Sequence, residues 1–429
     1  MISTTTILLA FLILLSMPVA AVLIFTGWAL SDLYAFFPLM DALGEITWSA
    51  STEFVLVAIP LFIMMGEILL RSGMTDEMYR SVNLWVGRVP GGLMHTNIFS
   101  CALFAATSGS SVATTATMGT VTIPNIKKYG YQPSLFLGTI AAGGTLGILI
   151  PPSINMILYG ILAETSVSTL YLAALIPGLL MGALFSIAVL VACLAKPEWD
   201  GDEVPRSSLL QKLAGLKGII IPILLFGLVV GSIYAGVATP TEAAALGVMG
   251  ALAVSLIKRR LTFVALAEVF QATIRTTSLV MLIVLAAYFL NFVITNIGLT
   301  DILTEKVSTL GWDPLYILFA IIGVYILLGC FMETLSLMIA TTPIVVPIIT
   351  ALGFDPVWFG VLFMILLETA LITPPIGMNL FIVQSVRGEG QFKEVIYGAA
   401  PFLLMMFVLI GLLIAFPQLA LWLPDFVSK

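Results

Sequence analysis

The stretch TSGSSVATTATMGTVTIPN at residues 107–125, continued by LGTIAAGGTLGILIPPSIN at residues 137–155, decides the fold. It places small hydroxylated residues and then two consecutive prolines inside apolar sequence. A second copy follows 223 residues later, as GCFMETLSLMIATTPIVVPI at 329–348 and GVLFMILLETALITPPIGMN at 360–379. The prolines and glycines coincide without a gap in these pairs: Pro124 and Pro347, Gly130 and Gly353, Pro133 and Pro356, Pro151-Pro152 and Pro374-Pro375. The chain therefore contains two copies of one unusual element.

The composition indicates a polytopic α-helical membrane protein. Of 429 residues, 60% are hydrophobic and 9% charged, and the mean hydropathy is +1.14. A soluble chain would expose too much apolar surface with this composition. The apolar runs fit helices of about 17–25 residues crossing a hydrocarbon layer of about 30 Å, whereas barrel strands are shorter and alternate. The net charge of −6 and the lack of a basic patch argue against a nucleic-acid partner.

Lysine and arginine predict how the chain threads through the membrane, because cytoplasmic loops carry an excess of them. Five clusters define the inner side: Arg71, Arg80 and Arg88; Lys127 and Lys128; Lys196, Arg206, Lys212 and Lys217; Lys258, Arg259, Arg260 and Arg275; Arg387 and Lys393. With all five inside, the predicted spans are 4–30, 53–71, 169–195, 217–235, 241–257, 277–297 and 395–423. A long hydrophilic loop occupies 196–216, and amphipathic arms occupy 75–89, 261–275 and 300–313.

The same map predicts two re-entrant hairpins of opposite orientation. Residues 92–126 begin and end inside, with a tip at Ser108–Ser111, and residues 314–353 begin and end outside, with a tip at Gly329–Thr334. Each hairpin is followed by a span broken at a Pro-Pro pair, at 133–163 and 356–386. Two such units are inverted-topology repeats, which are typical of secondary transporters.

The chemistry of these elements favours sodium sites. Each proline removes a backbone donor, and neighbouring glycines allow the helix to unwind. The freed carbonyls coordinate Na⁺, and half-helix N-termini face an anion. Cages of neutral oxygens suit a monovalent cation better than Ca²⁺, which takes several carboxylates. The alternative is that small residues only allow helices to pack closely.

Four carboxylates lie at membrane depth, where charges are costly and often functional. Glu333 and Glu368 are candidates to line the site or to carry protons. Glu242 follows Thr239-Pro240-Thr241 and is equally well explained as a helix cap, and Glu67 as a packing or arm-anchoring residue. His95 is the one histidine and has no second His or Cys nearby, so a transition-metal site or a Ser-His-Asp triad is not expected.

The motifs SGSSVATTATMGTVTIP, ILIPPSIN, GVATPTEAAALG and LITPPIGMN resemble the large membrane subunit of tripartite ATP-independent periplasmic (TRAP) transporters. The resemblance covers essentially the whole chain. It implies Na⁺-coupled uptake of a carboxylated solute, of the sialic acid or C4-dicarboxylate class, by an elevator motion in a bacterial inner membrane. It also implies two protein partners, a small four-helix membrane subunit and a soluble periplasmic binding protein, in addition to membrane lipid. No such small subunit precedes residue 1, so a separate one is expected.

The resemblance also assigns residues. Sodium ligands are expected at Ser108, Ser110, Gly147 and Pro151 in the first half, and at Met332, Glu333, Thr334, Ala370 and Pro374 in the second. Substrate contacts are expected at Ser111, Asn155, Thr373 and Asn379. The transport domain would consist of 92–163 and 314–386, with scaffold and arms at 1–91, 164–276, 277–313 and 387–429.

Three alternatives remain. A stand-alone Na⁺/anion symporter would share this architecture and need no binding protein. An intramembrane enzyme would need an acid pair, a Ser/Lys dyad or a metal cluster at depth, and none is evident, so the chain is predicted not to be an enzyme. A channel would need no inverted hairpins.

Overall fold

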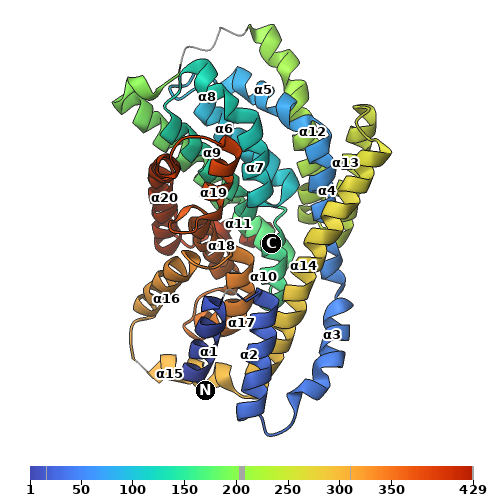
Figure 1. Cartoon of the computed structure of the whole chain (residues 1–429), viewed down its shortest axis with the longest axis vertical. Helices are drawn as coiled ribbons and strands as arrows, with labels where there is room; N and C mark the ends of the chain where they lie inside the picture. The colour runs from blue at the N-terminus through green and yellow to red at the C-terminus, as the bar shows by residue number, and fades with distance from the viewer. Residues whose placement is uncertain (16, 202–207, 310, 428–429) are drawn as a thin grey trace.

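The computed structural model describes residues 1–15, 17–201, 208–309 and 311–427, which fold as helices joined by short connections (Figure 1). The first part of the chain contains α1 (Ile2–Leu14), α2 (Val19–Tyr34), η1 (Leu39–Ala42), α3 (Leu43–Ser51), η2 (Phe54–Val57), α4 (Ala58–Arg71), α5 (Met74–Val86), α6 (Leu93–Ser108), α7 (Ser111–Thr122), α8 (Pro124–Tyr129), α9 (Pro133–Leu149), α10 (Ile154–Leu162), α11 (Val167–Ala195) and η3 (Pro197–Trp199). The second contains α12 (Leu209–Tyr234), α13 (Pro240–Ile257), α14 (Phe263–Asn296), α15 (Leu299–Thr309), α16 (Pro314–Gly329), α17 (Thr334–Ala351), α18 (Pro356–Ile372), α19 (Met378–Arg387), α20 (Phe392–Ala415) and α21 (Gln418–Val427). Within the described residues, seven helices are long and apolar enough to cross a membrane, or eight if the bent pair α9–α10 is one span.

The helices end and restart at both predicted hairpin tips and at both predicted Pro-Pro breaks. Helices α6 and α7 are separated by two residues, and Gly109 adopts the left-handed conformation with φ of 61°. Helices α16 and α17 are separated by residues 330–333. Helices α9 and α10 are bent by 42° around the first Pro-Pro pair, and residues 373–377 separate α18 from α19 around the second.

The predicted first span, residues 4–30, is wrong as a single helix. The chain folds there into the antiparallel pair α1 and α2, and the hydroxyls of Thr4 and Tyr34 lie 2.7 Å apart. Pro18 explains the break, because proline disfavours helical backbone in the residue before it and cannot donate to the preceding turn. Helix α2 then packs along α14.

Three further boundaries differ from the prediction. The expected arm at 261–275 is the beginning of the continuous 34-residue helix α14, since no glycine or proline interrupts residues 263–296. The expected last span divides at Pro417 into α20 and α21. Helix α12 begins eight residues before the expected 217, because Ser208 and Gln211 form a capping box there. In the rest of the predicted loop, η3 occupies Pro197–Trp199, and residues 202–207 with Arg206 lie outside the described residues.

The helices pack as two groups. Helices α6, α7, α11, α18 and α20 surround α9, whereas α4 packs on α13 and α14, α14 also packs on α2, and α12 packs mainly on α5 and α13. Helix α20 approaches α9 backbone to backbone at Gly138 and Gly398, and Ser134 Oγ donates to Glu394 O at 2.6 Å. The division into transport domain and scaffold stays a prediction, but the sequence assigned α11 and α20 to the scaffold, and both pack on the first broken helix.

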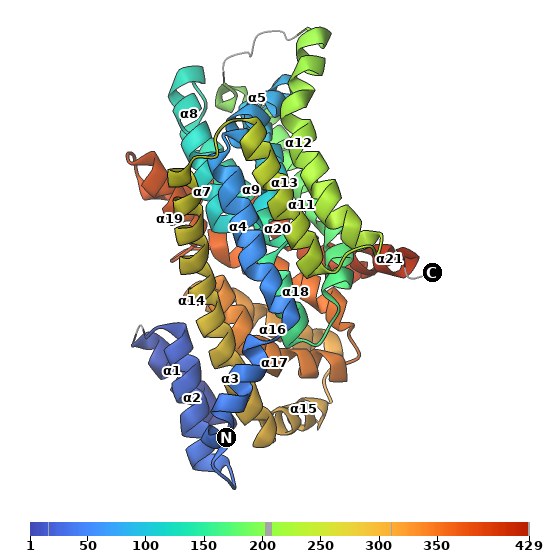
Figure 2. The ribbon, with the colours of Figure 1, turned by 90° about the vertical axis from the view of Figure 1, so that its right-hand side faces the viewer.

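The basic segments gather toward one end of the molecule. Figure 2 shows α5, α8 and the beginning of α12 at the upper end, and α3 and α15 at the lower end. The ion pair between Lys258 and Glu77 joins the end of α13 to α5 at the upper end. This arrangement agrees with the expected inner location of the first four clusters.

Candidate functional site

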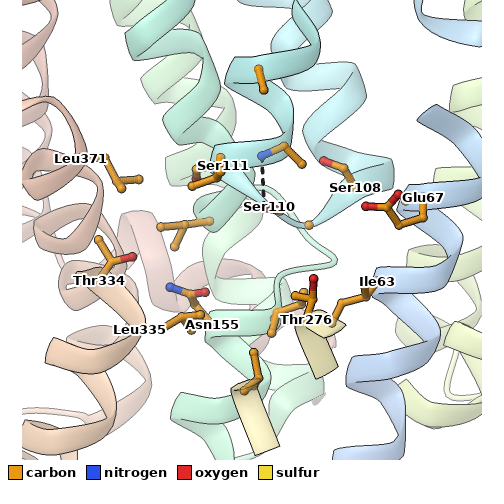
Figure 3. Close-up of a pocket in the computed structure, with 18 of the residues that line it drawn as sticks. Ile63, Glu67, Ser108, Ser110, Ser111, Asn155, Thr276, Thr334, Leu335 and Leu371 are labelled. Atoms are coloured by element: carbon orange, nitrogen blue, oxygen red, sulfur yellow. Dashed lines mark hydrogen bonds between the residues drawn. The ribbon is translucent and has the colours of Figure 1, made fainter. Parts of the chain in front are cut away.

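The hairpin tips and the first break meet at one cavity of about 380 Å³ (Figure 3). Six of the predicted site residues line it: Ser108, Ser110, Ser111, Asn155, Glu333 and Thr334. Seven predicted residues, although described, do not line it: Gly147, Pro151, Met332, Ala370, Thr373, Pro374 and Asn379. The site therefore has a solute-sized space with polar tips, and the remaining predicted residues lie elsewhere around it.

The first tip packs directly on the first broken helix. A Cβ added at Gly147 would lie 2.7 Å from the backbone carbon of Ser110 and from the nitrogen of Ser111, so this contact requires glycine. A Cβ at Gly109 would lie 2.8 Å from the carbonyl oxygen of Pro152. Ser111 Oγ donates to Thr145 O at 3.1 Å across the same contact. The structure thus brings together Gly147, the Ser110-Ser111 backbone and the first Pro-Pro break, which contain residues of the first expected set of sodium ligands.

Hydroxyl groups organise the first tip internally. Ser110 caps α7 by accepting from the Ala113 N–H at 3.4 Å, and Thr114 Oγ1 donates to Ser110 O at 2.7 Å. The hydroxyls of Ser108 and Thr114 lie 3.0 Å apart. Neutral hydroxyl and carbonyl oxygens therefore converge at a backbone turn, which is a donor set of the kind that suits a hard monovalent cation.

The second tip is organised by a carboxylate instead. Glu333 caps α17, because its two oxygens accept from Leu335 N at 3.0 Å and from Ser336 N at 2.9 Å. The Ser336 hydroxyl adds a third bond at 2.9 Å. A Cβ at Gly329 would lie 2.6 Å from the Cβ of Ala370, so this tip also approaches its broken helix closely. Glu333 thus has a structural role that the sequence did not predict.

The two predicted amides have different surroundings. Asn155 lines the cavity, and its Nδ2 is buried without a hydrogen-bond partner among the described residues. Asn379 is fully buried away from the cavity, where its Nδ2 donates to Ala141 O at 3.1 Å and joins α19 to α9. Thr373 Oγ1 donates to Thr369 O at 2.5 Å within the end of α18. Of the predicted substrate contacts, Asn155 and Ser111 are therefore the ones that the cavity brings together.

The opposite wall of the cavity comes from α4 and α14, and sequence reasoning missed most of it. Ile63, Gly66, Glu67 and Leu70 line it from α4, and Thr276 and Val280 line it from α14. A Cβ at Gly66 would lie 3.2 Å from Ser108 Cα, so the first tip rests on α4. Glu67 forms an ion pair with Arg71, whose Nε donates to Glu268 of α14 at 3.3 Å. The i, i+3, i+4, i+7 spacing on α4 is ordinary helical periodicity, which does not by itself distinguish a cavity wall from a packing face.

The remaining candidates, Glu242, Glu368 and His95, have three different surroundings. Glu242 forms the expected capping box with Thr239 at the start of α13. Glu368 is fully buried in α18, and in the described part of the chain neither of its carboxylate oxygens has a hydrogen-bond partner. His95 contacts Ser186 Oγ at 2.6 Å and Pro90 O at 2.7 Å near the start of α6, which confirms a polar helix-end residue. No group of three His, Cys, Asp or Glu residues suited to a metal ion occurs within the described part of the chain.

Comparison with known proteins identifies the family. The family model described as "Tripartite ATP-independent periplasmic transporter, DctM component" matches residues 6–419. The chain belongs to this family. As a DctM component it is a multi-pass membrane protein of a transporter, in agreement with the resemblance that its motifs suggested.

Two curated relatives and one solved structure illustrate the similarity. The C4-dicarboxylate TRAP transporter large permease protein DctM of Pseudomonas aeruginosa is 33% identical over 89% of this chain and 88% of that protein. The sialic acid TRAP transporter large permease protein SiaM of Vibrio cholerae is 31% identical over 87% of each. The crystal structure of the YdaH transporter of Alcanivorax borkumensis superposes on the DctM component with a TM-score of 0.65, at 16% identity, over 97% of this chain and 99% of that one. The last similarity concerns the fold alone.

Proposed function

We propose that this DctM component performs Na⁺-coupled secondary uptake of a small carboxylated solute. The observation that supports the proposal best is the meeting of both hairpin tips and the first break at one cavity. Relatives named for C4-dicarboxylate and sialic acid transport support the solute class, because both solutes carry carboxylates. The family supports transport driven by an ion gradient rather than by an enzymatic step.

The first sodium ion would bind where the tip of the first hairpin meets the first Pro-Pro break. Ser108 and Ser110 would supply hydroxyl or carbonyl oxygens, and the backbone around Gly147 and Pro151 would supply carbonyls freed by the two prolines. The closeness of Gly147 to the Ser110 backbone supports this assignment. A second ion would bind at the corresponding place in the other half, through Met332, Glu333, Thr334, Ala370 and Pro374. The cap bonds of Glu333 make backbone oxygens the better ligands there.

The solute would bind in the cavity beside these ions. Asn155 Nδ2, which has no hydrogen-bond partner within the described ranges, would donate to a carboxylate, and Ser111 also lines the cavity. Bound Na⁺ would supply positive charge, since no lysine or arginine is among the described residues that line the cavity. Thr373 and Asn379 would act indirectly, by holding the ends of the second broken helix.

The two halves would work as inverted repeats in an elevator mechanism. The same order of arm, hairpin and broken helix in α5–α10 and α15–α19 supports this proposal. The cavity lies between the group around α9 and the group containing α4 and α14, which is where a moving part would slide along a static one. We propose that α11 and α20 move with the hairpins, because they pack on α9.

Two partners complete the proposed transporter in the bacterial inner membrane. A small four-helix membrane subunit would pack on the scaffold, and a periplasmic binding protein would deliver the solute to the outer face. Both follow from the family, whose description names a tripartite transporter.

Reconstituted uptake tests the proposal. The chain and its small subunit are placed in liposomes, and binding protein loaded with radiolabelled solute is added with an inward Na⁺ gradient. We expect uptake that requires both the binding protein and Na⁺, and that is lost in the double variant Ser108→Ala, Ser110→Ala. The matched control is Thr120→Ala, which removes a hydroxyl near the far end of α7. Uptake indifferent to Na⁺ would contradict the sodium sites, and uptake without binding protein would indicate a stand-alone symporter.

A further inference from the structure

Glu67 is the charged residue of the cavity wall that does not cap a helix. Of the described residues that line it, two are charged, Glu67 and Glu333. Four donors saturate Glu333, from the backbone of Leu335 and Ser336 and the side chains of Thr334 and Ser336. Figure 3 shows the carboxyl group of Glu67 on the side of α4 that faces Ser108. A solute in the cavity therefore meets the charge of Glu67 on the α4 wall.

Arg71 neutralises this charge only in part. Its guanidinium lies between two carboxylates, because one end pairs with Glu67 and Nε donates to Glu268 at 3.3 Å. The three side chains together have a net charge of −1. Arg71 does not line the cavity, whereas Glu67 does. The α4 wall thus presents the negative charge of Glu67 to a solute, whereas the positive charge of Arg71 lies outside the cavity lining.

We infer that Glu67 selects solutes by charge, and that this transporter favours a small solute with one carboxylate and a neutral or positively charged remainder over a dicarboxylate. The carboxylate end would lie at the tip hydroxyls, Asn155 and bound Na⁺, and the other end would lie toward Glu67. This inference rests on the proposed function, because it concerns the solute of the same cavity. It narrows the solute class that the two named relatives leave open.

The size of the cavity makes the effect measurable. A volume of about 380 Å³ corresponds to a sphere about 9 Å across, so a solute that fills the cavity places its far end within a few ångströms of the wall. At such distances a second carboxylate facing Glu67 loses about tenfold or more in affinity, even with strong dielectric screening. A second carboxylate would therefore be disfavoured, and an ammonium group favoured.

Three solutes of equal length test the inference. Tritiated 4-aminobutyrate, butyrate and succinate each have a four-carbon chain with a carboxylate at one end, and the other end is an ammonium group, a methyl group and a second carboxylate, respectively. Binding of each is measured on the complex of this chain with its small subunit in nanodiscs at saturating Na⁺. We expect affinity to fall in the order 4-aminobutyrate, butyrate, succinate. In Glu67→Gln, we expect the ratio of the 4-aminobutyrate and succinate affinities to fall by about tenfold.

Glu268→Gln is the matched control. Like Glu67→Gln, it changes the net charge of the three side chains from −1 to 0, but it leaves the carboxylate that lines the cavity in place. Glu268 lies outside the cavity and its side chain is 57% exposed, so solvent screens its action on the solute. We expect its ratio to stay within about threefold of the wild-type value. Arg71→Gln should widen the ratio instead, because it leaves Glu67 without its counter-charge; if that variant does not fold, the other two still decide.

Three results would overturn the inference: succinate binding more tightly than 4-aminobutyrate, a ratio that Glu67→Gln does not change, or no binding of any probe. The proposed function is judged separately, by Na⁺-dependent uptake with a binding protein. Uptake that persists while the ratio is unchanged would remove Glu67 as the selective residue and keep the transporter.

Discussion

The two hairpin tips face one cavity but stabilise their turns with different chemistry. In the first half, the hydroxyl of Ser110 caps the second leg of the hairpin, and a glycine in the broken helix lets the tip backbone approach. In the second half, the carboxylate of Glu333 caps the second leg through two backbone bonds, and alanine stands at the position of Gly147. The two halves therefore share a backbone path, but each half stabilises that path with different side chains.

The largest effect is expected where the first tip touches its broken helix. In Gly147→Ala, the new Cβ would lie 2.7 Å from backbone atoms of Ser110 and Ser111, which have no flexible end that can move aside. We expect uptake to fall by about 100-fold, because a shift of about 1 Å at a site costs this much. The free energy of unfolding should fall by about 1–3 kcal/mol through overpacking. Uptake in proteoliposomes and thermal unfolding measure the two effects.

The control for this change is Gly182→Ala on α11, where the nearest atom to the added Cβ is Leu146 Cδ1 at 4.0 Å. Gly329→Ala sharpens the comparison, because its Cβ would meet a side-chain carbon of Ala370 at 2.6 Å, and it should reduce uptake less than Gly147→Ala. Normal uptake by Gly147→Ala would refute the close backbone contact as a functional feature.

The two amides are expected to fail in different ways. Asn155→Ala removes a cavity donor that has no protein partner, so we expect about a tenfold weaker apparent affinity for solute, equivalent to one hydrogen bond of about 1.4 kcal/mol, with little change in stability. Asn379→Ala removes the buried bond to Ala141 O, so we expect the free energy of unfolding to fall by about 1–3 kcal/mol with an unchanged KM. Uptake kinetics and chemical unfolding of both variants check this. The opposite assignment of the two effects would show that Asn379 is the one near the solute.

A smaller effect is expected from the caps of the two tips. Glu333→Ala removes the acceptors for two backbone donors, and we expect a loss of about 1–2 kcal/mol of stability. Ser110→Ala removes one long bond of 3.4 Å, and its loss of stability should be about 0.5 kcal/mol, at the lower limit for caps. The Na⁺ concentration for half-maximal uptake should rise more in Ser110→Ala than in Glu333→Ser, which keeps a capping hydroxyl. A larger sodium effect at Glu333 would make its carboxylate a ligand.

The sequence was sufficient to predict the helix breaks that prolines and glycines define. The paired prolines predicted both helix breaks, because proline restricts the backbone whatever surrounds it. The Lys/Arg map located both tips, and the helices end and restart at each of them. The expected arm at 261–275 was wrong because polar residues alone do not end a helix that lacks glycine or proline. The single first span was wrong because Pro18 breaks the helix within an apolar run.

The cavity was predictable from one side only. Polar residues within apolar sequence were conspicuous on that side: Ser108, Ser110, Ser111, Asn155 and Glu333. Gly66 and Val280 have no such mark, and only tertiary packing places α4 and α14 opposite the tips. For the same reason, the sequence placed Asn379 at the solute, whereas the structure turns it toward Ala141.

The smallest effect is expected where the two halves meet through an exposed ion pair. Lys127, after the first hairpin, lies 2.7 Å from Glu389, after the second broken helix. The hydrogen bond and charge of Lys127 lower the pKa of Glu389 below its ordinary value. A carboxyl with a lowered folded-state pKa stabilises the fold fully above its unfolded pKa of about 4.3, and this contribution is lost as the pH falls through the folded value. We therefore expect the Tm of wild type to exceed that of Glu389→Gln slightly at pH 7, and the two to converge as the pH falls below about 4. Because both side chains are exposed, 1 M salt should also remove the difference. Thermal unfolding of both proteins across this range measures it, and a difference that persists at acid pH would mean that the two halves are held together there by packing rather than by this pair.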